Sequence, residues 1–234
     1  AVVVAYTLFG GFLAVSYTDF LQGLLMFLAL IFVPIIGLFA TGGLDSTVES
    51  IKEVNPNHLS LIAGTTTAGI ISSLAWGLGY FGQPHIIVRF MAISSVKETK
   101  NARRIGIGWM ILSLVGAIST ALVGLAYYKQ HPELTLTDPE AIFIALGQIV
   151  FHPFIAGLVL AAVLAAIMST ISSQLIVTSS ALIEDLYKAF IKTDASDRTY
   201  VNYGRIAVLA VSIIAAVLAW EQNETILGLV AFAW

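Results

Sequence analysis

The sequence predicts an all-α, polytopic membrane protein built as a bundle of transmembrane helices, and three observations lead to that fold class. Hydrophobic residues make up 58% of the 234 residues and charged residues only 11%, whereas about a quarter of the residues of a soluble domain are charged. The mean hydropathy is +0.92. The charged residues are also unevenly spaced and leave long apolar runs between them. This composition excludes a water-soluble globule, a disordered chain and a nucleic-acid-binding protein.

The lengths of the uncharged runs predict five complete crossings, with a partial one at each end of the chain. A helix needs about 20 apolar residues to cross about 30 Å of hydrocarbon. Two runs have the length of a single crossing, and the others reach that length when a break or a few flanking residues are allowed for. The five expected crossings cover residues 20–44, 59–88, 105–128, 154–183 and 201–220.

The N-terminal part is expected to begin with the partial crossing, because residues 1–14 are apolar from the start. Asp19 and Gln22 then form an N-cap and capping-box pattern in front of the next apolar run, which predicts the start of a helix. Residues 55–58, with the sequence Asn-Pro-Asn-His, are expected to form the loop before the second complete crossing.

The uncharged run over residues 141–183 is too long for one helix, and His152-Pro153 divides it. A short amphipathic stretch is expected over residues 141–151, followed by a crossing that starts near Phe154. Pro153 suits the first turn of that helix, because its missing N–H costs nothing at this position.

The ends of the sequence predict an internal piece of a longer chain. The sequence starts without Met, lacks the positive residues of a secretory signal, and stops within the apolar run 226–234. We expect residues 1–234 to form one membrane domain in a lipid bilayer, next to further N-terminal and C-terminal helices of the same protein.

The distribution of lysine and arginine predicts the orientation in the membrane. Nine of the eleven basic residues fall in residues 89–104 and 184–205, and the other two are Lys52 and Lys129. The two basic segments are therefore expected on the cytoplasmic side.

The glycine-rich segment WGLGYFGQPH, residues 76–85, is the first candidate functional motif. Glycine costs a helix about 1 kcal/mol and proline about 3 kcal/mol relative to alanine. A broken helix in mid-membrane exposes backbone dipoles to a solute or an ion, as it does in secondary transporters. Trp76, Tyr80 and Pro84 are spaced so that they would share one face of a helix. The alternative is a kinked crossing whose small residues only let helices pack closely.

The hydroxyl-rich segment AAIMSTISSQ, residues 165–174, is the second candidate motif. Ser169 and Thr170 lie three and four residues after Ala166, on the face of its carbonyl. Hydroxyls and a released carbonyl suit a small alkali cation. The alternative is that the hydroxyls bond back to carbonyls of their own helix. In the functional interpretation, both motifs are helix interruptions that face one pocket in mid-membrane.

Asp19, in the segment of residues 10–22, and Arg89, four residues after His85, are two further candidate residues. Besides the capping role, Asp19 could be a carboxylate at the cytoplasmic mouth that attracts a departing cation. We expect the Arg89 side chain to extend to the membrane boundary.

No enzyme is predicted. The chain has no cysteine, no Walker loop, no G-x-S-x-G motif and no metal-binding spacing of His, Asp and Glu. Without a nucleotide site, transport would depend on an ion gradient.

Four stretches together resemble the sodium/solute symporter family. They are residues 10–19 (GGFLAVSYTD), 76–91 (WGLGYFGQPHIIVRFM), 164–174 (LAAIMSTISSQ) and 183–190 (IEDLYKAF). The stretch that contains GQPH is similar to the proline-transporting branch of that family.

The resemblance implies a five-plus-five inverted-repeat core and sodium-coupled symport of L-proline, by a multi-pass protein of the cell membrane. It implies a sodium site at the Ala166 carbonyl and the Ser169 and Thr170 hydroxyls, and an ion-release path at Asp19. The implied substrate-binding residues are Trp76, Tyr80 and Pro84. These 234 residues are expected to lack the first core helix of the family, and they are therefore not expected to transport on their own.

Two other functions fit the same residues. One is sodium symport of another small organic solute, and the other is a transporter-like sensor module of a membrane signalling kinase. A passive channel is disfavoured, because no repeated ring of pore-lining carbonyls or charges is present.

Overall fold

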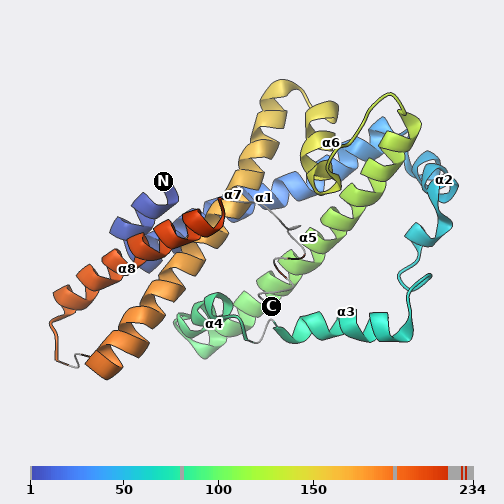
Figure 1. Ribbon diagram of the computed structural model, residues 1–234. Helices are drawn as coiled ribbons and strands as arrows, with labels where there is room; N and C mark the ends of the chain where they lie inside the picture. The colour runs from blue at the N-terminus through green and yellow to red at the C-terminus, as the bar shows by residue number, and fades with distance from the viewer. Residues whose placement is uncertain (1, 80–81, 192–193, 221–227, 229, 231–234) are drawn as a thin grey trace. The chain divides into compact units, whose positions relative to one another are not determined.

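The computed structural model describes residues 2–79, 82–191, 194–220, 228 and 230. All regular secondary structure in these residues is helical, as the sequence predicts (Figure 1). The α-helices are α1 (Val2–Ala40), α2 (Leu44–Val54), α3 (Thr67–Gly79), α4 (Pro84–Met91), α5 (Val96–Gln130), α6 (Ile142–Val150), α7 (Pro153–Ser180) and α8 (Asp197–Leu218). Two 3₁₀-helices, η1 (Pro56–Leu59) and η3 (Pro139–Ala141), and a π-helix, η4 (Ala181–Ile191), complete the order.

Four helical segments of the described chain are long and apolar enough to cross a membrane: α1, α5, α7 continued by η4, and α8. In the most apolar stretch of each segment, between 11% and 28% of the residues are buried. The remaining apolar side chains, such as Phe9 at 81% exposure and Phe39 at 73%, face outward. This is the distribution expected of helices that are surrounded by lipid or by further helices.

The expected crossing over residues 59–88 is not one helix. Its first residue, Leu59, ends the 3₁₀-helix η1. The helices that follow after residues 60–66 are α3 and α4, which are 13 and 8 residues long. The break between α3 and α4 lies within the glycine-rich segment, so the predicted interruption is confirmed there. Gln83 has an extended backbone, and Pro84 begins α4 at the position where its missing N–H is harmless.

The predicted helix start at Asp19 is wrong. Helix α1 runs through Asp19 without a break, and it joins the expected partial crossing to the first complete one. The irregularity lies earlier, at Gly11, whose φ of 56° and ψ of −156° are not helical. These angles fall in a region that only glycine adopts readily.

Two further boundaries were predicted correctly. The expected amphipathic stretch forms α6, and α7 begins at Pro153. The loop expected at residues 55–58 contains Asn55, whose side chain accepts a hydrogen bond of 2.9 Å from the N–H of Asn57 and so begins η1.

The chain divides into two compact units, each of which is described by itself. The first unit comprises Ala1–Phe20, Ser73–Ala92 and Ile167–Trp234, and the second comprises Leu21–Ser72 and Ile93–Ala166. Helices α1, α3 and α7 each contribute one part to both units.

The second unit has the clearer apolar core. Val33, Val123, Leu146 and Val159, from α1, α5, α6 and α7, are each at most 5% exposed and form one cluster. Gly124 allows close packing in this unit, because a Cβ atom there would lie 2.5 Å from Cγ1 of Ile142. Small residues let membrane helices approach in this way.

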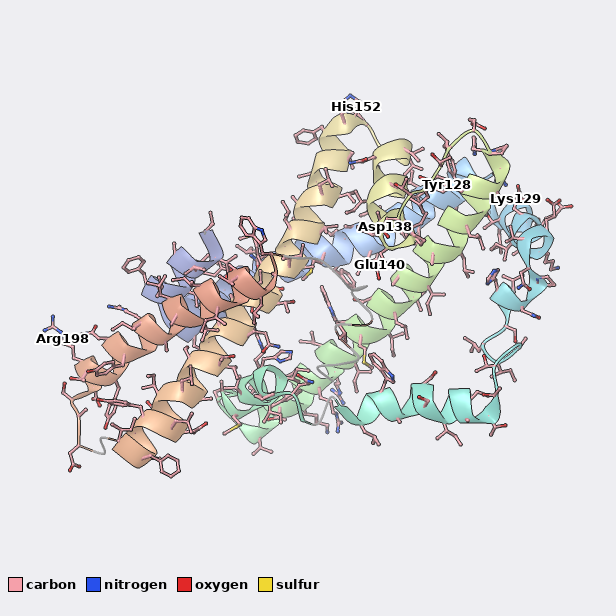
Figure 2. All side chains as sticks on the ribbon, in the orientation of Figure 1. Tyr128, Lys129, Asp138, Glu140, His152 and Arg198 are labelled. Atoms are coloured by element: carbon pink, nitrogen blue, oxygen red, sulfur yellow. The ribbon has the colours of Figure 1, made fainter. Side chains whose placement is uncertain are left out.

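Gln130, the last residue of α5, ties α2 to α5 in the same unit. Its amide nitrogen lies 3.1 Å from the Thr41 carbonyl oxygen, 3.0 Å from Ser46 Oγ and 2.9 Å from Ser50 Oγ. Its neighbours Tyr128 and Lys129 mark this end of α5 in Figure 2. A half-buried amide with three acceptors fixes the position of a short helix that has little apolar surface of its own.

Candidate functional site

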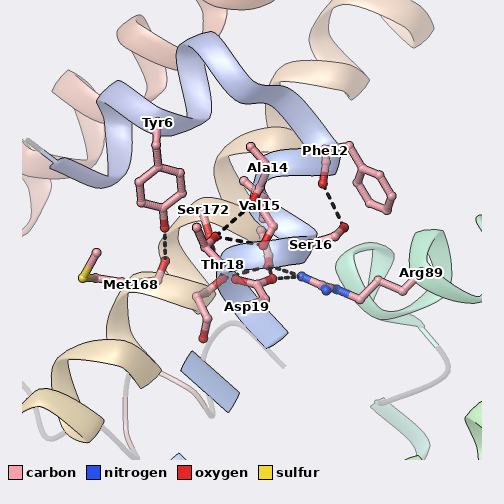
Figure 3. Close-up of polar contacts among 12 residues, drawn as sticks. Tyr6, Phe12, Ala14, Val15, Ser16, Thr18, Asp19, Arg89, Met168 and Ser172 are labelled. Atoms are coloured by element: carbon pink, nitrogen blue, oxygen red, sulfur yellow. Dashed lines mark hydrogen bonds and ion pairs between the residues drawn. The ribbon is translucent and has the colours of Figure 1, made fainter. Parts of the chain in front are cut away.

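The polar centre of the first unit is formed by Asp19, Arg89 and Ser173, which come from α1, α4 and α7. Figure 3 shows the Arg89 side chain directed at Asp19. Nη2 of Arg89 donates a hydrogen bond to Oδ2 of Asp19 and forms an ion pair with it. The same nitrogen lies 2.6 Å from Oγ of Ser173. One guanidinium group therefore joins three helices that are far apart in the sequence.

Burial differs between the two charged side chains. The Asp19 side chain is 10% exposed and the Arg89 side chain 39%. Arg89 therefore pairs with an acid on another helix, and its extension to the membrane boundary stays a prediction. Charges inside a membrane protein are usually paired in this way, because an isolated charge in hydrocarbon is costly.

Helix α4 also contacts α7 one residue further along. Nε2 of Gln174 lies 3.1 Å from Nδ1 of His85. Together with the contact between Arg89 and Ser173, this contact places the helix after the glycine-rich break directly against the hydroxyl-rich part of α7. Both contacts lie about one turn beyond Thr170 in the direction of the C-terminus.

The second predicted interruption does not exist. Helix α7 is continuous over residues 153–180 and includes the whole hydroxyl-rich segment. Oγ of Ser172 and Oγ of Ser173 donate to the Ser169 carbonyl over 3.0 Å and 2.8 Å, so these two hydroxyls bond back to their own helix. This is the alternative that the sequence left open, and it is favoured in lipid because it satisfies a polar group within the helix.

The six remaining candidate residues are placed as follows. Ser169 and Thr170 lie in the first unit, in the middle of α7, and Ala166 lies at the edge of the second unit on the same helix. Trp76, which is 36% exposed, lies on α3, and Pro84 is the first residue of α4. Tyr80 lies outside the described residues.

Sequence reasoning missed Arg89 and Ser173 as partners of Asp19. The available signal was the basic residue at the end of the glycine-rich segment, since a buried acid in a membrane protein needs a cation or several donors nearby. Nothing in the sequence indicated which of the basic residues would meet it, because Asp19 and Arg89 are 70 positions apart.

The non-helical angles at Gly11 bend α1, and a carbonyl group next to this bend has a hydrogen-bond donor on another helix of the first unit. In a regular helix, the Leu8 carbonyl would accept from the N–H four residues later, and the non-helical angles at Gly11 disturb that turn. Nε of Arg205, on α8, donates a hydrogen bond of 3.1 Å to the Leu8 carbonyl. The Arg205 side chain thus supplies a hydrogen-bond donor to a backbone carbonyl at the bend.

These features define an all-α, multi-pass membrane protein with one bent helix, one broken helix and a charged residue pair between helices of one unit. The profile of the sodium:solute symporter family matches residues 1–234, and the chain belongs to that family.

Curated relatives match the whole chain. It is 66% identical over 233 residues to the high-affinity proline transporter PutP of Bacillus subtilis (strain 168) and 54% identical over 234 residues to the osmoregulated proline transporter OpuE of the same organism. It is 52% identical over 236 residues to sodium/proline symporter 2 of Staphylococcus saprophyticus. The chain is covered completely in each case and spans about half the length of these relatives, 49%, 47% and 46%. No solved structure was found to match it.

Proposed function

We propose that the protein to which these residues belong couples the inward movement of sodium to the uptake of L-proline across the cell membrane. The observation that carries this proposal is the identity of 66% to a proline transporter along the whole of this chain. The family itself is one of sodium:solute symporters. In this proposal the protein is a transporter and not an enzyme, and the ion gradient supplies the driving force.

The broken helix supports a solute site near α4. Backbone groups that are released between α3 and α4 need partners, and a polar solute can provide some of them. Trp76 precedes the break and Pro84 follows it, so both flank the released backbone. We assign substrate contacts to these two residues and, from the sequence, to Tyr80.

The sodium ion is assigned to the middle of α7. Sodium prefers oxygen ligands, and the Ser169 and Thr170 hydroxyls with the Ala166 carbonyl offer three on one stretch of helix. Because α7 is continuous there, the proposal requires the remaining ligands to come from other helices. The five-plus-five inverted repeat and a role of residues 1–234 as one membrane domain remain part of the same proposal.

Asp19 is assigned to the path by which sodium leaves. The site is then ordered first by sodium, which allows proline to bind at the broken helix, and the two leave together on the cytoplasmic side. The cytoplasmic location of residues 89–104 and 184–205 follows from their basic residues.

The test is uptake by the purified full-length protein in proteoliposomes. We expect labelled L-proline to accumulate when sodium is present outside and to remain at the background level when potassium replaces sodium. A panel of unlabelled amino acids and carboxylic acids checks the solute. Sodium-dependent uptake that excess proline does not reduce would overturn the assignment of the solute, and equal uptake in sodium and potassium would overturn the coupling.

A further inference from the structure

The Asp19 carboxylate uses only one of its two oxygen atoms in the described part of the chain. Oδ2 accepts from Arg89, whereas Oδ1 is buried and has no hydrogen-bond partner among the residues that the structure describes. A buried polar atom without a partner is unusual in a native protein and calls for an explanation. The Asp19 side chain is nine-tenths buried, so bulk water does not provide an obvious one.

A hydroxyl oxygen lies beside this carboxylate. Oγ of Ser173 is 3.5 Å from Oδ2 of Asp19. Its proton is directed to the Ser169 carbonyl, which is closer at 2.8 Å, so the lone pairs of Ser173 are left for a cation. At present that cation is the guanidinium group of Arg89, at 2.6 Å.

A small cavity of about 10 Å³ lies next to Arg89 and Ser173. Its lining is mostly apolar, with residues such as Val15 and Ile176, and does not include Asp19. The size is comparable to that of one water molecule. The carboxylate and the hydroxyl are oxygen ligands of the kind that a small monovalent cation binds, and the guanidinium group of Arg89 contacts both of them.

We propose that Arg89 is an internal counter-cation for Asp19, which occupies the carboxylate while no sodium is there and which a departing sodium ion must displace. This inference rests on the proposed function and extends it. Sodium and guanidinium cannot share the carboxylate at close range, because two like charges repel strongly in a medium of low dielectric constant. Without either cation, the buried carboxylate would be unpaired, which is strongly unfavourable.

The exchange of cations would also move a helix. Arg89 lies on α4, which has only eight residues and begins directly after the break that follows α3. Release of Arg89 from Asp19 and Ser173 removes contacts that hold α4 against α1 and α7. Pro84, assigned above to the substrate site, is the first residue of the same helix. Arg89 thereby links the occupation of the ion path to the position of the broken helix.

The proposal separates two activities of the carrier. Net uptake requires the empty carrier to reorient, and in that step Asp19 depends on Arg89. Exchange of labelled for unlabelled proline, with saturating sodium on both sides, avoids the empty carrier. A variant that lacks the counter-cation should therefore lose net uptake selectively, whereas a general defect in folding or substrate binding would reduce both activities.

The experiment compares R89Q, R89K, D19N and the double variant D19N/R89Q of the full-length protein, each purified and reconstituted at equal amounts. We expect R89Q to lower net uptake by about tenfold and exchange by no more than about twofold, because only the empty carrier holds an unpaired carboxylate. R89K keeps a cation and should lie closer to the wild type. The double variant should transport no more slowly than D19N, because no carboxylate then remains to be neutralised.

The control is R198Q, which removes a cation from α8. The Arg198 side chain extends away from the helix and is exposed (Figure 2). Equal losses of net uptake and exchange in R89Q, a further loss in D19N/R89Q relative to D19N, or the same behaviour of R89Q and R198Q would each overturn the proposal. A wild-type protein that shows no sodium-dependent uptake would instead overturn the proposed function.

Discussion

Gly116 of α5 lies directly against the backbone of Leu30 of α1. A Cβ atom on Gly116 would be 3.1 Å from the carbonyl carbon of Leu30 and 3.3 Å from its Cβ, with the carbonyl oxygen closer still. Backbone atoms cannot move aside as the end of a flexible side chain can. This position therefore sets how closely the two helices pack in the second unit.

The first prediction concerns this contact. Gly116→Ala should lower the stability of the protein by about 1–3 kcal/mol, because the added methyl group forces the helices apart. Gly108→Ala on the same helix is the matched control, since a Cβ atom there meets nothing within 4 Å. It should be neutral or raise the stability by up to about 1 kcal/mol, as expected from helix propensity. Thermal unfolding of the two purified full-length variants decides between them, and equal effects would contradict the packing argument.

The second prediction compares two neighbouring residues at the end of α5. Gln130→Ala should cost about 1–3 kcal/mol, because it leaves buried acceptors on α2 and at Thr41 without their donor. Lys129→Ala removes only an exposed ion pair with Glu53 at 3.6 Å, and it should cost less than about 1 kcal/mol. Limited proteolysis should show faster cleavage near α2 in the Gln130 variant alone. Similar cleavage in both variants would argue against the role of Gln130.

The third prediction concerns the bend in α1. Gly11→Ala should lower stability by about 1–3 kcal/mol, because its φ of 56° and ψ of −156° are strained for any side chain. No atom lies within 4 Å of the added Cβ, so a steric clash would not explain the effect. Gly204→Ala, in the regular part of α8 and equally uncrowded, is the control. Both variants are compared by thermal unfolding, and a Gly11 variant as stable as the wild type would show that the bend is not required.

The fourth prediction tests the proposed sodium ligands on α7. The double variant Ser169→Ala, Thr170→Ala should raise the sodium concentration for half-maximal proline uptake by about tenfold or more, which corresponds to roughly 1.4 kcal/mol of lost binding. Ser179→Ala is the control on the same helix, because it removes a hydroxyl, bonded to the Ile176 carbonyl over 3.0 Å, that lies more than two turns beyond the proposed ligands. An unchanged sodium dependence in the double variant would remove Ser169 and Thr170 from the ion site.

The parts of the fold that the sequence predicts depend on composition and on local backbone preferences. The long apolar runs predicted the crossings of α5, α7 and α8, since the free energy of transfer into lipid depends mainly on composition. Pro153 and the glycine-rich segment marked a helix start and a break, because proline and glycine change the backbone locally. These features need no knowledge of distant contacts.

The errors arose where one local sequence pattern was compatible with more than one structure. Asp19 looked like a helix cap, but it lies within a helix that continues past it, and it pairs with Arg89. The serines of α7 looked like an interruption, although Ser172 and Ser173 bond back to the helix and preserve it. The adjacent glycines Gly10 and Gly11 indicate a bend in the helix. The prediction instead placed the helix boundary at Asp19, because an aspartate is a common N-cap residue.

The hydrogen bond from Arg205 to Leu8 means that the curvature of α1 is secured by a residue 197 positions away. A chimera that takes its N-terminal helix from one relative and its C-terminal part from another would inherit the bend without its donor, unless position 205 kept a suitable side chain. Segments exchanged between such transporters should therefore be chosen so that this pair travels together.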